Sequence, residues 1–139
     1  RYNNLNVLTN GLYTALELMK IDSVNVHLLG GNLNKILLDT KGTDTMSQIG
    51  MHHSDIAFIS CRGITARGSF DPNDDETAVK RAFAENSTKV VLFADSSKFN
   101  KTFLNVSLGY DVIDAIISDA PFPEDIQEVC RNKNVEMLW

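Results

Sequence analysis

Short apolar runs alternate with amphipathic segments along almost the whole chain. The runs have the length and composition of β-strands, and the segments between them place apolar residues on one helix face. We expect strands at residues 5–9, 24–29, 55–60, 89–94, 114–118 and 135–138. We expect helices at residues 11–20, after Gly42, from 74 to about 85, and from 124 to 133. This alternation predicts an α/β fold with a largely parallel, Rossmann-like sheet and helices on both faces.

The segment around residues 55–60 refines the expected packing. Residues 56–59, Ile-Ala-Phe-Ile, are apolar without alternation, which is typical of a parallel strand covered on both faces. Residues 61–73 have the composition of a long polar loop, and residues 32–40 that of an excursion or an edge strand. We therefore expect six strands and four helices in all.

The first helix shows both a start signal and an inner face. Asn10 is the expected N-cap, because its short side chain can accept a hydrogen bond from the first turn. Leu12, Ala15, Leu16 and Met19 then recur at the spacing of one apolar stripe. We expect this stripe to face the sheet.

Composition narrows the class of protein. The chain has 139 residues, of which 43% are hydrophobic, which suits one domain with its own core. Its 18 acidic and 13 basic residues give a net charge of −5, which argues against a nucleic-acid or anionic-membrane surface within these residues. Cys61 and Cys130 match no metal-ligand spacing, so free thiols in a cytoplasmic protein, with no metal and no cofactor, are the expectation.

The most informative stretch is the exit of the strand at 89–94. The apolar run stops at Asp95 and is followed by Ser96, Ser97 and Lys98, two hydroxyls and an ammonium. Ligands of α/β proteins bind beyond the carboxyl ends of parallel strands, so these residues lie where an anion would bind. The alternative is ordinary helix capping, which uses the same short polar side chains.

Other strand exits carry compatible groups, and one lysine follows on the next helix. Glycines allow close backbone approach, and cations attract a phosphate. Each of these residues also has a structural interpretation as a turn, a cap, a solvated charge or a surface lysine. The predicted binding residues are Thr9, Asn10, Gly30, Gly31, Arg62, Gly63, Lys80, Ser96, Ser97 and Lys98.

Four acidic residues near residue 74 are candidates for acid–base chemistry. They are Asp71, Asp74, Asp75 and Glu76. A run of acids that enters a helix is usually a solvated helix start, favoured by the helix dipole. We expect no catalytic residue.

These segments, in this order, carry a family resemblance. The matching stretches include Asn6–Asn10, Leu28–Leu33, Asp55–Ile64, Glu76–Arg81 and Leu92–Phe99. Together they resemble the C-terminal effector-sensing domain of DeoR-type bacterial transcriptional regulators. The resemblance implies a cytoplasmic sensor of a phosphorylated sugar or related metabolite, in a repressor that forms homo-oligomers and binds no membrane. DNA would be bound only through a helix-turn-helix domain that lies outside this chain.

The chain departs from the family pattern at its start. The family's sensor domain opens with a strand and an Asp-Ser-Gly-Thr-Thr-like phosphate loop, and neither occurs here. Gly11 stands where the family tends to have Ser. Residues 1–4 are followed directly by a strand, without a helix before it. We therefore expect residues 1–139 to be a single sensor domain, truncated at its N-terminus.

The family also resembles ribose-5-phosphate isomerase, which implies an isomerase-like fold. The isomerase has an Asp-Gly-Ala-Asp-Glu segment where this chain has Ile59–Gly63, and a Glu-Lys pair where it has Val79-Lys80. Losing a positioned base removes about 10²–10⁴-fold of rate. The resemblance thus implies a sensor without catalysis. The alternatives are an isomerase-like enzyme whose base has moved to Asp71 or Glu76, and a pure oligomerisation module.

Overall fold

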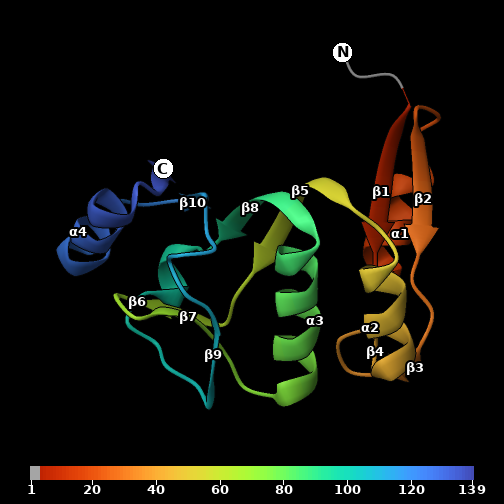
Figure 1. The fold of residues 1–139 in the computed structure, drawn as a ribbon, viewed down its shortest axis with the longest axis horizontal. Helices are drawn as coiled ribbons and strands as arrows, with labels where there is room; N and C mark the ends of the chain where they lie inside the picture. The colour runs from red at the N-terminus through yellow and green to blue at the C-terminus, as the bar shows by residue number, and fades with distance from the viewer. Residues whose placement is uncertain (1–3) are drawn as a thin grey trace. The chain divides into compact units, whose positions relative to one another are not determined.

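The computed structural model describes residues 4–139, which form two compact units, Arg1–His52 and His53–Trp139. All six predicted strands are present in the described chain (Figure 1), but only four of them share one sheet, and the first two pair with each other in a separate sheet. They are β1 (Leu5–Thr9), β2 (Val24–Leu28), β5 (Ser54–Ser60), β8 (Ser87–Phe93), β10 (Ala115–Ile117) and β11 (Glu136–Leu138). The predicted helices are α1 (Leu12–Leu18), α2 (Thr43–Gly50), α3 (Asp74–Glu85) and α4 (Glu124–Lys133). The expectation that no helix precedes the first strand falls, for residues 1–3, outside the described residues.

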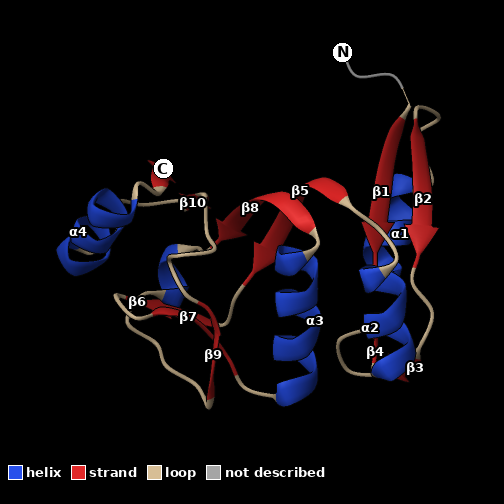
Figure 2. Cartoon of the chain, viewed as in Figure 1, coloured by secondary structure: helices blue, strands red, loops and turns tan. Residues whose placement is uncertain are grey.

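The main sheet of the second unit has the strand order β11-β10-β8-β5, and every pair is parallel. Figure 2 distinguishes the strands from the helices by colour. Leu92 of β8 lies opposite Ile59 on one side and Ile116 on the other, and Leu92 and Ile116 are fully buried. All four strands are parallel, α3 lies between β5 and β8 along the chain, and α4 lies between β10 and β11, so the α/β class is confirmed. Helix α3 packs against β8 and β5.

Only one face of β5 is buried, contrary to the expectation of a strand covered on both faces. Ala57 and Ile59 are in the core, whereas Ile56 is 45% and Phe58 64% exposed. The Phe58 ring contacts the ring of Phe93, which is 42% exposed, at 5.7 Å between centroids. β5 is the edge strand of its sheet, so its outer apolar residues find few neighbours.

The segment predicted as a long polar loop is a buried β-hairpin. β6 (Gly63–Thr65) and β7 (Gly68–Asp71) are antiparallel, and β7 also pairs with β9 (Asn105–Leu108). The loop prediction was wrong because small and polar residues fill this hairpin. Two hydroxyls satisfy each other inside it: Ser69 and Ser107 lie 2.8 Å apart, and both are buried.

Helix α3 begins where the acidic run predicts. The Asn73 side chain accepts a hydrogen bond from the Glu76 N–H at 2.8 Å, and its amide donates to the Glu76 carboxylate at 2.8 Å. The first of these bonds satisfies an orphan N–H of the first turn, and the second holds the two side chains together. Asp74, Asp75 and Glu76 occupy that turn, where the helix dipole favours negative charge.

The first unit joins the parallel pair β1–β2 to an antiparallel hairpin, β3 (Asn32–Asn34) and β4 (Asp39–Lys41). Residues 32–40 thus form a hairpin of their own. The N-cap of α1 is Gly11, not Asn10, and no side chain caps it.

The expected inner face of α1 is only partly buried. Ala15 is in the core, whereas Leu16 is 56% and Met19 69% exposed. The helical spacing of the apolar residues therefore located α1, but it did not show how many of those residues are buried. Within residues 4–139, no helix is both long and apolar enough to cross a membrane.

Candidate functional site

The loop after β8 carries the strongest anion-binding signal of the sequence. Residues Ser96–Lys98 form a short 3₁₀ helix, η1, directly after Asp95. The Ser97 N–H donates to the Asp95 carboxylate at 3.0 Å, and the Ser97 hydroxyl donates to the same oxygen. The Ser96 N–H donates to the Asp119 carboxylate at 2.7 Å. The backbone donors expected to hold an anion therefore already bind two carboxylates of the protein.

These hydrogen bonds keep both carboxylates ionised. The Ser97 hydroxyl and N–H lower the pKa of Asp95, with a smaller contribution from the Lys98 charge. The Ser96 N–H lowers the pKa of Asp119 in the same way. Hydrogen bonds to the charged form stabilise it, so both groups remain negative well below neutral pH.

Two cations near these strand exits keep their binding capacity. Arg62 follows β5 and is exposed, and Lys98 ends η1 and is half-buried. Among residues 4–139, no carboxylate pairs with either side chain. An unpaired ammonium and an unpaired guanidinium are the groups that bind phosphate in proteins.

The β8 loop is fixed against β6 by backbone contacts. The Asn100 N–H donates to the Ile64 carbonyl at 2.9 Å, and Ile64 forms a parallel bridge with Phe99. A Cβ atom on Gly63 would lie 2.1 Å from the Lys101 carbonyl oxygen. Gly63 is therefore needed for the approach of another part of the backbone, which fixes the position of the segment after Lys98.

Asp71 and Lys80 form a buried ion pair that the sequence did not reveal. Asp71 ends β7 and is fully buried, and the Lys80 ammonium on α3 lies 2.5 Å from its Oδ1 atom. Asp71 was therefore wrongly grouped with the solvated acids of the helix start. The cap at Asn73 was an available signal, because it begins the helix two residues after Asp71 and leaves Asp71 to the preceding strand.

Cys61, the residue after β5, lies among these charged groups. Burial, with a smaller contribution from Asp71, raises the pKa of its thiol to about 12, although Lys80 and Lys98 act in the opposite direction. A thiol with so high a pKa is neutral at physiological pH and is no nucleophile. Both cysteines are buried and free, as predicted.

In the first unit, the predicted residues Thr9 and Asn10 make local structural bonds. The Thr9 hydroxyl accepts a hydrogen bond from the Gly11 N–H at 3.1 Å. The Asn10 amide donates to the Thr40 carbonyl at 2.8 Å, and the Asn10 carbonyl accepts from the Thr40 N–H. Asn10 thus holds β4 instead of capping α1.

Gly30 and Gly31 connect β2 to the hairpin and contact helix α2. The Gly30 N–H donates to the Gln48 side chain at 2.9 Å, and its carbonyl accepts from the Thr45 hydroxyl at 2.7 Å. Gly31 has a φ of +144°, and a Cβ there would lie 2.0 Å from the Thr45 hydroxyl. Glycine is required at Gly31 both by its backbone conformation and by the space available.

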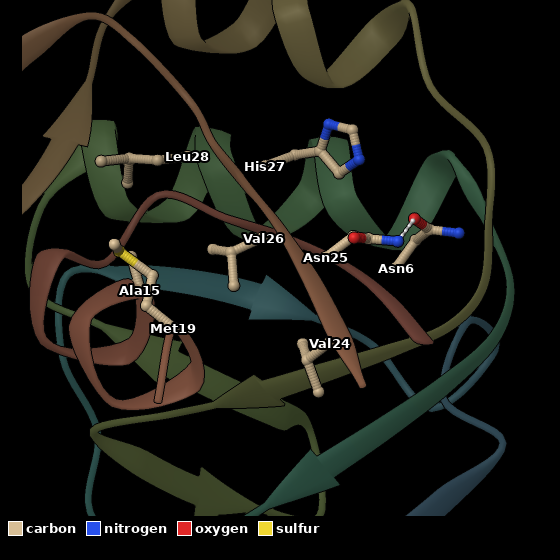
Figure 3. Close-up of a pocket in the computed structure, with 8 residues that line it drawn as sticks. All are labelled: Asn6, Ala15, Met19, Val24, Asn25, Val26, His27 and Leu28. Carbon is tan, nitrogen blue, oxygen red and sulfur yellow. Dashed lines mark hydrogen bonds between the residues drawn. The ribbon is translucent and has the colours of Figure 1, made fainter. Parts of the chain in front are cut away.

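A hollow of about 650 Å³ lies over β1, β2 and α1 (Figure 3). Its wall is mainly apolar, with His27 and an Asn25–Asn6 amide contact of 3.3 Å as polar features. None of the predicted binding residues lines it. His27 lies within β2, and its ring is 6.3 Å from that of His52, which follows α2.

The structure thus groups the predicted residues into two sets. Within the second unit, contacts around the β8 loop, β6 and α3 involve Arg62, Gly63, Lys80, Ser96, Ser97 and Lys98. The first unit holds Thr9, Asn10, Gly30 and Gly31. That the two sets form one site stays a prediction.

Comparison with known proteins places the chain. A family model described as the DeoR C terminal sensor domain matches residues 1–120. The chain belongs to the DeoR C-terminal sensor domain family. The DeoR-type resemblance found in the sequence is therefore confirmed.

Similar proteins extend over nearly the whole chain. The glycerol-3-phosphate regulon repressor of Escherichia coli K12 is 31% identical over 138 residues, which cover 98% of this chain and 54% of the relative. The regulator GolR of Listeria innocua is 32% identical over 119 residues, covering 85% and 47%. The repressor GlcR of Bacillus subtilis is 26% identical over 132 residues, covering 95% and 51%. The DeoR-type sensor domain described here spans about half the length of these curated relatives.

Proposed function

We propose that this sensor domain binds a phosphorylated sugar or a related phosphorylated metabolite at the β8 loop. The observation that carries the proposal is the Lys98 ammonium, which pairs with no carboxylate among residues 4–139 and follows the hydroxyls of Ser96 and Ser97 at a parallel-strand exit. A similar protein is named for a glycerol-3-phosphate regulon, which supports a phosphorylated ligand. Lys98 would pair with the phosphate as a point charge.

Two carboxylates of the protein already accept hydrogen bonds from the N–H groups that were expected to bind the phosphate. The N–H groups of Ser96 and Ser97 donate to Asp119 and Asp95, so a phosphate would meet the Lys98 ammonium first. Arg62 would supply a second charge, and Gly63 would keep its backbone role. The ligand contacts assigned to Thr9, Asn10, Gly30 and Gly31 belong to the same proposal, without support from their hydrogen bonds.

In the whole protein, the domain would act on a DNA-binding segment outside this chain. The relatives matched are named as transcriptional regulators, and the chain spans about half of each. A ligand shifts an equilibrium only if it binds one state better than the other. We propose that residues 1–139 are one sensor domain of an oligomeric, cytoplasmic repressor, in which effector binding changes the state of the oligomer.

The proposed fold is isomerase-like, without isomerase chemistry. The four-stranded parallel sheet and the binding groups at its strand exits support the likeness. Purified protein incubated with ribose 5-phosphate should show no ketose formation at ordinary enzyme rates. Turnover would favour the alternative of an enzyme with Asp71 or Glu76 as its base.

The proposal is tested by thermal unfolding with a panel of compounds. Glucose 6-phosphate, fructose 6-phosphate, ribose 5-phosphate and glycerol 3-phosphate would each be compared with the unphosphorylated parent. A ligand at about 100 times its Kd stabilises the folded state by about 2.7 kcal/mol, so at least one phosphorylated compound should raise Tm while its parent does not. Equal shifts for both members of every pair, or no shift at all, would contradict phosphate recognition.

A further inference from the structure

One carboxylate oxygen in the second unit has no hydrogen-bond donor. Asp71 is fully buried, its Oδ1 atom accepts from Lys80, and its Oδ2 atom is buried without any partner in the described chain. An ionised carboxylate offers about four lone-pair sites. A buried acceptor left unsatisfied destabilises the folded state, so such a group calls for an explanation.

The neighbouring polar groups on the same strand show how a purely structural site is built. Ser69, two residues before Asp71 on β7, bonds the Ser107 hydroxyl at 2.8 Å, and its oxygen also accepts from the Leu108 N–H at 3.1 Å. Both hydroxyls are buried and satisfied. β7 can therefore satisfy its buried polar groups, and at Asp71 it leaves one oxygen open.

Asp71 and Lys80 lie close to the proposed phosphate site. The Arg62 N–H donates to the Phe70 carbonyl at 3.0 Å, so the end of β7, where Asp71 stands, lies beside the exit of β5. Asp71, Lys80, Lys98 and Asp95 also all act electrostatically on the Cys61 thiol. The Cys61 thiol also lies 3.9 Å from the Phe93 carbonyl, which joins the exits of β5 and β8. The ion pair thus lies at the end of the sheet that carries Lys98.

We propose that Asp71 and Lys80 read the hydroxyl groups of the effector, an inference that rests on the proposed function. The Asp71 Oδ2 atom would accept a hydrogen bond from one sugar hydroxyl, and the Lys80 ammonium would donate to the oxygen of that hydroxyl or the next. The ligand class is therefore a phosphorylated polyol or sugar, in preference to a phosphate ester without hydroxyls.

Access to this subsite follows from the Lys80 side chain. That side chain is 16% exposed whereas Asp71 is fully buried, so a ligand would reach the lysine side of the pair first. The terminal torsion of an aspartate is broad and roughly two-fold, so the carboxylate can turn and present its second oxygen once Lys80 engages the ligand. A compound that lacks the hydroxyl would leave this oxygen unpaired, which is how such sites reject analogues.

The test compares two probes on matched variants of the protein. The first probe is the tightest-binding compound among glucose 6-phosphate, fructose 6-phosphate, ribose 5-phosphate and glycerol 3-phosphate, and the second is inorganic phosphate. We expect Asp71→Asn to weaken the sugar probe by roughly tenfold or more, because a hydrogen bond to a charged group is lost, and to leave phosphate binding within about twofold. Ser69→Ala, which removes a buried polar group from the same strand, should leave both affinities unchanged.

Stability is controlled with a second variant. If Asp71→Asn does not fold, the neutral pair Asp71→Asn with Lys80→Gln removes both charges together, and it should show the same selective loss. Equal weakening of both probes, or unchanged sugar affinity, would mean that the ion pair is structural. This result would overturn the further inference and leave the proposed function standing. If the wild-type protein binds no compound of the sugar panel, the proposed function fails and this inference fails with it.

Discussion

Two aspartates of the second unit meet their hydrogen-bond donors in opposite ways. Asp119 is exposed, yet it accepts from the Ser96 N–H at 2.7 Å and from the hydroxyls of Ser96 and Ser118. Asp71 is fully buried, yet one of its oxygens has no donor in the described chain. Asp119 thus occupies the backbone donor of the loop for which the sequence predicts a ligand. The Asp71 Oδ2 atom, in contrast, can still accept a hydrogen bond.

The largest expected effect on stability comes from removing the buried ion-pair partner of Asp71. Lys80→Met would leave both oxygens of Asp71 buried without a donor. Removing one partner of a buried ion pair costs about 3–5 kcal/mol, so the free energy of unfolding should fall by that amount in urea titrations. Adding Asp71→Asn should recover part of the loss, because the uncompensated charge disappears. Additive losses in the double variant would show that the two residues do not act as a pair.

The next effect concerns the loop that carries Lys98. Gly63→Ala places a Cβ 2.1 Å from the Lys101 carbonyl oxygen, so the backbone must shift. Overpacking of this kind costs about 1–3 kcal/mol, and urea unfolding would measure it. Gly109→Ala is the matched control, because its Cβ meets nothing within 4 Å. Equal stability of the two variants would contradict the close packing of β6 on this loop.

A smaller effect comes from an exposed ion pair used as a reference for the buried one. Lys133 and Asp111 lie 2.7 Å apart, with side chains 49% and 78% exposed. Exposed pairs contribute about 0.2–1 kcal/mol, so Lys133→Ala should lower the free energy of unfolding by no more than this. The difference from wild type should shrink further in 1 M salt, since salt screens exposed charges. A loss of stability as large as that of Lys80→Met would show that the buried pair contributes no more than the exposed one.

The smallest effect is confined to acid. The folded pKa of Asp119 is depressed by the Ser96 N–H, so its contribution to stability is present above the unfolded pKa of about 3.9 and is lost as pH falls through the folded value. Asp119→Asn should therefore flatten the fall in stability below about pH 4. Urea titrations from neutral to acid pH measure this slope. An unchanged slope would mean that the hydrogen bonds of Asp119 are not formed in solution.

The pattern of apolar residues predicted the strands of the parallel sheet but not the hairpin that follows β5. The runs around Leu92 and Ile116 identified central strands, because a buried parallel strand is apolar throughout. The hairpin at Gly63–Asp71 escaped because its buried positions are filled by Gly, Ser and Asp, which look like loop residues. Phe58 was expected inside and is exposed, since periodicity does not show which neighbours exist.

The candidate site was predicted by residue type and only partly by role. Lys98 was recognised from its place after a strand, and the structure leaves its ammonium unpaired among residues 4–139. The partners of Ser96 could not be predicted, because Asp119 lies 23 residues further along the chain. The buried state of Asp71 depends on a hairpin that the apolar pattern did not show. Long-range contacts of this kind leave no local signal.

The measurement that tests the proposed function most directly is a calorimetric titration of Lys98→Ala with the compound that stabilises the wild-type protein most. A charge-assisted bond contributes about 1.5–3 kcal/mol, so the affinity should fall by roughly tenfold or more. Lys101→Ala removes the same charge three residues away and should bind like wild type. Wild-type affinity in Lys98→Ala, or an equal loss in both variants, would contradict a phosphate site at Lys98.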